Sequence, residues 1–181
     1  MQARRISFVG SSGSGKTTLA SALADELALP RVELDAINWQ PGWRGLHIHD
    51  PQEFARRVDA TIASDAWVID GNYSAVRARI WARATHLIWL DYERLVIMAR
   101  VLRRSIARSL SGAELWPGTG NREEWSRWFT DPDHPIRWAW RTFKVRRVMY
   151  EAQLSDSNNA HLQVHRLRST REAIGVAARL V

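Results

Sequence analysis

The chain of 181 residues contains no cysteine, which excludes disulfide bridges and metal sites built on thiolates. It also lacks a run of about 18 apolar residues, the length that a membrane-spanning helix requires. The apolar stretch after Arg4 and Arg5 is short and leads into a glycine-rich turn, unlike the end of a secretory signal. Since no repeat or low-complexity linker is visible either, we expect one cytoplasmic domain over residues 1–181, with no membrane partner and no signature of an oligomeric state.

Lysine is scarce, although the chain is basic. Only Lys16 and Lys144 are lysines among the 26 basic residues, and the formal net charge is +7. Residues 93–150 contain twelve basic side chains and six acidic ones. A region with this balance attracts anions, a class that includes nucleotide phosphates, nucleic acid and lipid headgroups.

Short apolar runs alternate with amphipathic stretches along the chain. Runs rich in β-branched and aromatic residues predict five strands, at 4–9, 31–35, 67–70, 86–90 and 161–167. The stretches between and after them predict helices at 16–28, 50–64, 75–83 and 136–155, a long helix carrying Met98 and Leu110, and a last helix capped by Ser169. This alternation is typical of βαβ units, so we expect a three-layer α/β fold with a five-stranded parallel sheet.

The pattern is interrupted at residues 111–135, where glycine and proline recur. A connection of this length in a compact domain usually carries function. We expect a lid of helix and loop at about residues 103–135.

The strongest motif is the segment Gly10–Thr17, GSSGSGKT, which matches the P-loop pattern G-x-x-x-x-G-K-[ST] between a predicted strand and a predicted helix. Glycines let the backbone approach a phosphate closely, and successive N–H groups at a helix N-terminus attract anions. Lys16 is expected to reach the β- and γ-phosphates, and the Thr17 hydroxyl to ligate Mg²⁺. The residues expected to bind the nucleotide are Gly10, Ser11, Ser12, Gly13, Ser14, Gly15, Lys16, Thr17 and Thr18.

Three aspartates follow predicted strands. Asp70 comes after a hydrophobic strand at the right distance from the P-loop to hold Mg²⁺, and Asp91 is the rival candidate. Asp35 is expected at the end of the second strand, where it could accept a proton from an acceptor hydroxyl or orient metal-bound water. An ordinary role in a turn remains an alternative for Asp35 and for Asp70.

Arginines recur every four residues in the long helix. Arg100, Arg104 and Arg108 therefore share one face, and planar guanidinium groups neutralise a phosphoryl group during transfer. We expect Arg104 and Arg108 to be catalytic, Arg104 first. Because Met98 and Leu102 lie on the opposite face, a solvated arginine surface remains the alternative.

The ten tryptophans allow two interpretations. Tryptophans among arginines suit single-stranded nucleic acid, but Trp67 and Trp89 fall in predicted strands and indicate a core. Trp39 and Trp43 flank a Pro-Gly pair and are candidate walls of a substrate pocket.

Three segments together resemble the small P-loop kinases of the adenylate-kinase-like group: the P-loop, Leu34–Asp35 followed by the Trp-Gln-Pro-Gly-Trp segment 39–43, and the Trp-Val-Ile-Asp-Gly-Asn-Tyr segment 67–73. Within that group the chain is most similar to the DNA topology modulation proteins, over nearly its whole length. The resemblance implies a P-loop NTPase fold with a sheet of the nucleotide-kinase type and an arginine-bearing lid. In adenylate kinases Asp-Gly is followed by Phe-Pro-Arg, and the different residues at 72–74 argue against AMP as acceptor.

These observations predict an ATP-binding kinase that uses Mg²⁺ and transfers the γ-phosphate to a small acceptor, a nucleotide or nucleoside. The chain contains no Asn-Lys-x-Asp signature for guanine, which favours ATP over GTP. The alternative is a nucleotide-dependent DNA-binding regulator that uses the basic region 93–150, although no DNA-reading motif is visible. A binding fold without catalysis is disfavoured by the intact Lys16, Thr17 and Asp70.

Overall fold

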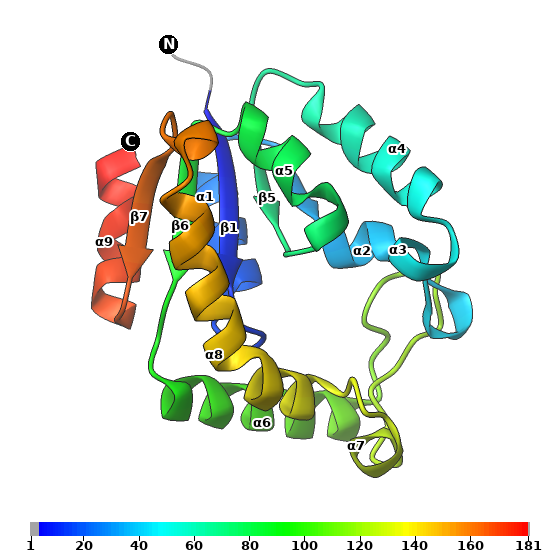
Figure 1. Cartoon of the computed structure of the whole chain (residues 1–181). Coiled ribbons are helices and arrows are strands. Elements are labelled where there is room, and N and C mark those ends of the chain that lie inside the picture. Colours follow the sequence, from blue (N-terminus) through cyan, green and yellow to red (C-terminus); the bar gives the residue numbers. More distant parts are fainter. Residues whose placement is uncertain (1–3, 181) are drawn as a thin grey trace.

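The computed structural model describes residues 4–180, with side chains for all of these except 177–179. Five parallel strands form one sheet in the order β2-β5-β1-β6-β7 (Figure 1). Their bounds are β1 Arg5–Gly10, β2 Arg31–Glu33, β5 Trp67–Asp70, β6 His86–Leu90 and β7 Gln163–Leu167. The predicted five-stranded parallel sheet is confirmed.

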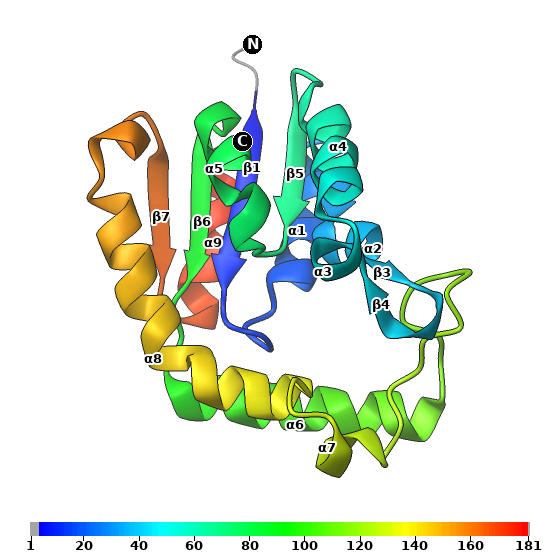
Figure 2. The same ribbon diagram turned by 45° about the vertical axis from the view of Figure 1, so that its right-hand side comes forward.

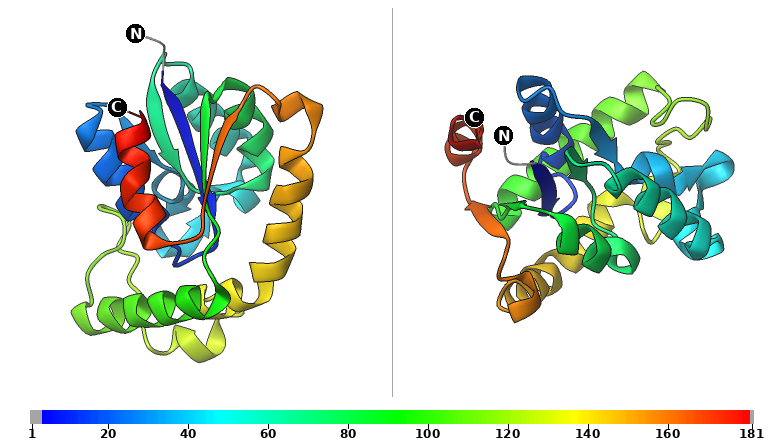
Figure 3. Two further views of the ribbon diagram at one scale, coloured as in Figure 1. Left: turned by 90° about the vertical axis from the view of Figure 1, so that its left-hand side faces the viewer. Right: turned by 90° about the horizontal axis from the view of Figure 1, so that it is seen from above.

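Helices cover both faces of this sheet (Figure 3). The helices α1 (Lys16–Glu26) and α9 (Thr170–Leu180) pack on one face, against Ile6, Phe8 and Ile88. The helices α4 (Pro51–Ile62), α5 (Ser74–Arg83) and the C-terminal part of α8 (Pro135–Leu154) pack on the other face, against strand residues that include Trp67, Ile69 and Trp89. Alternate strand residues face opposite layers, and both sets are buried. The three-layer α/β fold is therefore confirmed.

The register brings the functional strand ends together. Phe8 of β1 and Glu33 of β2 both pair with Asp70 of β5, and Gly10 pairs with Leu90 of β6. Parallel strands end at the same edge of a sheet, which is where an α/β fold binds its ligand. The segments after β1, β2 and β5 consequently share this edge.

The second strand is shorter than predicted. It ends at Glu33, and Asp35 lies in a short helix, α2 (Leu34–Asn38), so the prediction of Asp35 at a strand end was wrong. Leu34, the first residue of this helix, is buried in the core. A small hairpin, β3 (Trp39–Gln40) and β4 (Arg44–Gly45), follows α2, with a 3₁₀ turn at Pro41–Trp43 between its strands and α3 (Leu46–His49) after it.

The helix α6 (Arg94–Ser111) lies across the carboxyl edge of the sheet (Figure 2). It buries Ile97, Val101 and Ser105, whereas Leu102 and Leu110 of the predicted apolar stripe are 42% and 72% exposed. Two arginines of this helix, Arg100 and Arg104, contact the P-loop, whereas the Arg108 side chain is 37% exposed.

The residues between α6 and α8 form an ordered connection. It contains a bridge between Glu114 and Arg122 and the short helix α7 (Arg127–Thr130). A 3₁₀ turn at Ser157–Asn159 leads from α8 into β7. Within residues 4–180, no helix combines the length and apolarity that crossing a membrane would demand.

Candidate functional site

The P-loop connects β1 to α1 and closes on itself through Lys16. Its ammonium donates to the carbonyl oxygens of Gly10, at 3.1 Å, and Ser11, at 2.9 Å. Gly10 has φ +145°, and a Cβ there would lie 2.7 Å from the Leu90 carbonyl oxygen, so the neighbouring strand allows only glycine. The loop thus forms a cradle of backbone groups, and the Lys16 ammonium lies over it.

The charge of Lys16 is under strong influence from its surroundings. Burial is the main cause that lowers the pKa of Lys16 to about 8; the positive charges of Arg146 and Arg104 act in the same direction, while the negative charges of Asp35 and Asp70 oppose the shift. The charge of Lys16 therefore responds to two carboxylates and two guanidinium groups that come from four other parts of the chain.

Asp70 and Thr17 form a pair beside this cradle. The Thr17 hydroxyl donates to Asp70 Oδ2 at 2.7 Å, and Asp70 Oδ1 is buried with no hydrogen-bond partner among the described residues. Burial raises the pKa of Asp70 to about 6, with a contribution from Glu33 and an opposing one from the Thr17 bond. A hydroxyl and a carboxylate with a vacant oxygen are the hard oxygen donors that Mg²⁺ takes, so these residues fit the ion.

Asp91, the rival candidate for Mg²⁺, is already engaged. Arg166 lies 2.6 Å and Arg147 lies 3.1 Å from its Oδ2. These ion pairs connect the end of β6 with β7 and α8, and Asp70 is the candidate of the two that lies beside Thr17.

Asp35 reaches the site from α2 although its predicted strand end was wrong. Its Oδ1 accepts a hydrogen bond of 2.6 Å from the Tyr73 hydroxyl, and its charge opposes the lowering of the Lys16 pKa that burial causes. Asp35 is therefore near enough to the P-loop lysine for its charge to act on it.

Two arginines of α6 contact the P-loop directly. Arg100 donates to the Ser14 carbonyl and Arg104 donates to the Ser12 hydroxyl, both at 3.1 Å. Burial lowers the pKa of Arg104 to about 10, and the Arg104 Nε atom is buried with no partner in the part of the chain that the structure describes. A guanidinium with unused donors beside a phosphate cradle is suited to phosphate oxygens.

Arg108 lies one turn further along α6 and has a different neighbour. Its guanidinium is 3.7 Å from the buried carboxylate of Glu123 in the connection that follows α6. The structure thus places Arg104 against the P-loop and Arg108 against the expected lid.

Arg146 of α8 was missed by the sequence reasoning. It is half-buried, its charge adds to the effect of burial in lowering the pKa values of Lys16 and Arg77, and none of the described carboxylates forms an ion pair with it. Only its place in the basic region 93–150 could have pointed to it, because no motif marks the helix that follows the lid.

The expected lid contacts the opposite side of the site. Asn121 is 2% exposed, accepts from the Trp43 N–H and donates to the Gln40 carbonyl, both at 2.9 Å. The Trp116 indole donates to Glu33 at 3.1 Å. The connection between α6 and α8 is therefore attached to the hairpin and to β2, directly beside Asp70.

Three tryptophans join at this contact. The ring centroids of Trp39, Trp43 and Trp116 are 5.6–6.1 Å apart, and the Arg127 guanidinium lies 3.7 Å from the Trp43 ring. They form an aromatic wall between the hairpin and the connection that follows α6. Histidine is also present there, but the described residues contain no cluster of three His, Cys, Asp or Glu that could hold a metal ion.

Asp70→Asn is expected to stabilise the ligand-free protein at pH 8 by about 1–3 kcal/mol, because the folded state raises the pKa of this carboxyl from 3.8 to about 6. An acid whose pKa is raised on folding binds its proton more tightly when folded, so its ionisation costs stability as pH rises from 3.8 to 6. Thermal unfolding of both proteins should show the difference at pH 8 and not at pH 4. Adding Mg²⁺ and ATP should raise the unfolding temperature of the wild type more than that of Asp70→Asn. Equal unfolding temperatures of the two proteins at all pH values would contradict the assignment of Asp70 as a buried carboxyl with a raised pKa.

The sequence matches no known protein-family profile, and no curated protein resembles it in sequence. Solved structures share its fold. A gluconokinase from Sinorhizobium meliloti 1021 is 17% identical with a TM-score of 0.54, over 99% of this chain and 94% of that one. A shikimate kinase from Acinetobacter baumannii, in complex with shikimate, is 15% identical with a TM-score of 0.58, over 97% and 89% of the two chains. This likeness establishes the fold of small P-loop kinases; the narrower resemblance to DNA topology modulation proteins is not confirmed.

Proposed function

We propose that this protein is a kinase that transfers the γ-phosphate of ATP, bound with Mg²⁺, to a small acceptor. The observation that carries the proposal is the convergence on one sheet edge of a phosphate cradle, a vacant Asp70 oxygen beside Thr17, and the Asp35 carboxylate, whose charge acts on Lys16. A phosphate cradle alone would be enough to bind a nucleotide. Phosphoryl transfer also requires a carboxylate that holds the metal ion and a second carboxylate that accepts the proton of the acceptor.

Each group has a distinct part in this scheme. The backbone amides of residues 10–15 hold phosphate oxygens, and Lys16 exchanges its two carbonyl partners for the β- and γ-phosphates. Thr17 and Asp70 would hold Mg²⁺, which neutralises phosphate charge when bound. Arg104 stabilises charge on the transferred group, and Arg108 takes a secondary part from the lid.

The acceptor occupies the space beside Asp35. Asp35 is the base for its hydroxyl, the aromatic wall of Trp39, Trp43 and Trp116 bounds it, and Arg146 offers a cation without an acidic partner among the described residues. This composition suits a small molecule with a hydroxyl group and an anionic group, a description that includes nucleotides. Closure of the lid over it excludes water from the transferred phosphoryl group.

A panel of acceptors tests the proposal. ADP production from ATP and Mg²⁺ is measured with nucleoside monophosphates, nucleosides and small hydroxy acids, each alone at saturating ATP. One class of acceptor should stimulate ADP production well above the rate measured without an acceptor. If no member of the panel raises ADP production above that rate, the small-molecule kinase is rejected.

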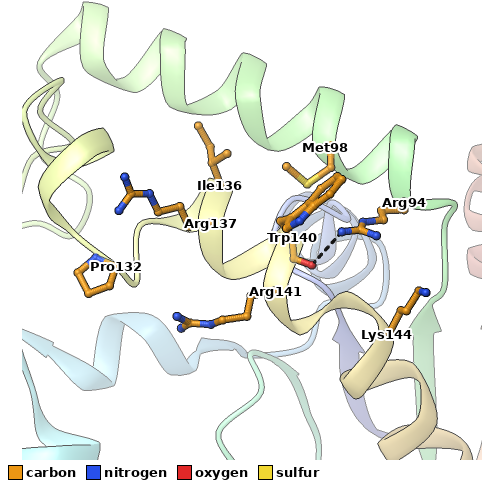
Figure 4. A pocket seen from close by; sticks show the side chains of 8 residues that line it. All are labelled: Arg94, Met98, Pro132, Ile136, Arg137, Trp140, Arg141 and Lys144. Carbon is orange, nitrogen blue, oxygen red and sulfur yellow. Dashed lines mark hydrogen bonds between the residues drawn. The ribbon is translucent and has the colours of Figure 1, made fainter.

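A second candidate function, binding of nucleic acid, is favoured by a groove of about 940 Å³ between α6 and α8 (Figure 4). Its eight lining residues include no acid, and four are basic: Arg94, Arg137, Arg141 and Lys144. Trp140 is 56% exposed, and the Arg94 guanidinium lies 3.3 Å from its ring centre. Cations beside an exposed aromatic ring suit single-stranded nucleic acid.

If this groove binds nucleic acid, affinity for a labelled (dT)₁₂ oligonucleotide should fall about tenfold between 50 and 200 mM salt, since only a few phosphates would be neutralised. The variant carrying Arg137→Gln and Arg141→Gln should bind more weakly and show a shallower salt slope, as measured by fluorescence anisotropy. The matched control removes two arginines of α5, Arg79 and Arg83. Equal loss in both variants would show that net charge, and not the groove, attracts the oligonucleotide.

A further inference from the structure

One hydrogen bond governs the orientation of Asp35. The Tyr73 hydroxyl donates to Asp35 Oδ1 at 2.6 Å, and it is the one hydrogen-bond partner of this carboxylate among the described residues. A phenol bound to a carboxylate at this distance forms a charge-assisted hydrogen bond. One carboxylate oxygen is therefore occupied, and Oδ2 is left to receive a different donor.

The Tyr73 ring is itself held in place. His47 and Phe54 contact it edge to face, each with ring centroids 5.0 Å from that of Tyr73, and His47 Nδ1 lies 2.7 Å from Asn38 Oδ1. Burial and the charge of Asp35 raise the pKa of Tyr73, so the hydroxyl keeps its proton throughout the ordinary pH range. The donor is thus permanent and has little freedom to turn away.

The backbone beside Tyr73 also determines where α2 lies. Gly71 has φ +131°, and a Cβ there would lie 2.6 Å from Leu34 Cβ. This close approach places Leu34, and with it Asp35, against the segment that follows β5. The four residues 70–73 consequently position two carboxylates, Asp70 by their own backbone and Asp35 through Tyr73.

We propose that Tyr73 is a positioning residue for phosphoryl transfer, which holds Asp35 so that Oδ2 receives the proton of the acceptor hydroxyl. This rests on the proposed kinase function. As the acceptor oxygen bonds to the γ-phosphorus, the bond from that phosphorus to the bridging oxygen breaks, and ADP leaves with the electron pair. The proton of the acceptor hydroxyl passes to Asp35 Oδ2. Tyr73 keeps its own proton throughout, and its hydrogen bond holds the Asp35 carboxylate in position before the transfer.

Tyr73→Phe in the full chain removes the hydroxyl and keeps the ring. With the acceptor found by the panel, we expect kcat to fall about tenfold to hundredfold, because general-base assistance is worth 10²–10⁴-fold and only part of it is lost. The KM for ATP should change less than about twofold, since the phosphate cradle is untouched.

A double-mutant cycle and a matched control separate positioning from general damage. In an Asp35→Asn background, Tyr73→Phe should have no further effect on kcat, because Tyr73 acts through Asp35. The control is Tyr92→Phe, which removes a hydroxyl from a tyrosine buried in the other core layer, and it should leave kcat unchanged. Additive losses in the double mutant, or an unchanged kcat in Tyr73→Phe, would overturn the role of Tyr73 while leaving the kinase standing. A wild type that transfers to no acceptor would overturn both.

Discussion

Lys16→Ala is expected to reduce transfer of the γ-phosphate by about 10²–10³-fold or more, the scale of losing one preorganised donor to a transferred group. The side chain is half-buried over the cradle with two carbonyl oxygens as its only hydrogen-bond partners among the described residues, and desolvation lowers the pKa of Lys16 to about 8. Bound phosphates would favour its charged form. The rate of single-turnover transfer from labelled ATP measures the loss.

The control for this variant is Lys144→Ala, which removes the other lysine of the chain from an exposed position on α8. It should transfer label at the wild-type rate. Thermal unfolding of Lys16→Ala should stay close to the wild type, since removal of a half-buried amine relieves a desolvation cost. Transfer that persists in a folded Lys16→Ala protein would mean that the cradle does not hold the reacting phosphates.

Arg104→Gln is expected to lower kcat by about 10³-fold with little change in the KM for ATP, because an arginine that neutralises the transferred group acts in the transition state. The structure supports this through the contact of Arg104 with Ser12, its burial, and its Nε without a partner among the described residues. Arg104→Lys should recover only part of the rate, since a lysine keeps the charge and loses the planar fork.

Arg103→Gln is the matched control, because Arg103 is the neighbouring residue on α6 and is exposed. It removes the same charge from the same helix and should leave kcat within about twofold of the wild type. Equal losses in the two variants would indicate that α6 contributes general charge or stability. A raised KM for ATP in Arg104→Gln, with kcat unchanged, would make Arg104 a binding residue.

The sequence predicted the sheet and the P-loop because both depend on local patterns. Each strand is a short apolar run flanked by turn residues, and GSSGSGKT combines glycine, lysine and threonine in the spacing that a phosphate cradle needs. The pairing of Thr17 with Asp70 followed from strand adjacency, since a carboxylate at the end of β5 must lie beside β1.

The rest of the site depends on tertiary contacts that periodicity cannot show. The apolar stripe of α6 predicted an inward face at Leu102, but the helix crosses the sheet edge, and its arginine face meets the P-loop. Asp35 was predicted at the end of a strand but lies in a helix, where the preceding Leu34 packs into the core against Gly71. Arg146 lies more than 100 residues from the P-loop in sequence, and only the folding of α8 across the sheet brings it near Lys16.

The destination of the γ-phosphate tests the central claim most directly. The wild-type protein is incubated with γ-labelled ATP, Mg²⁺ and the acceptor that stimulates ADP production, and the products are separated over a time course. We predict label on the acceptor in equal amount to ADP, little free phosphate, and no labelled product when Mg²⁺ is removed with a chelator. Label that appears only as free phosphate, or not at all, would contradict the assignment of this site to phosphoryl transfer.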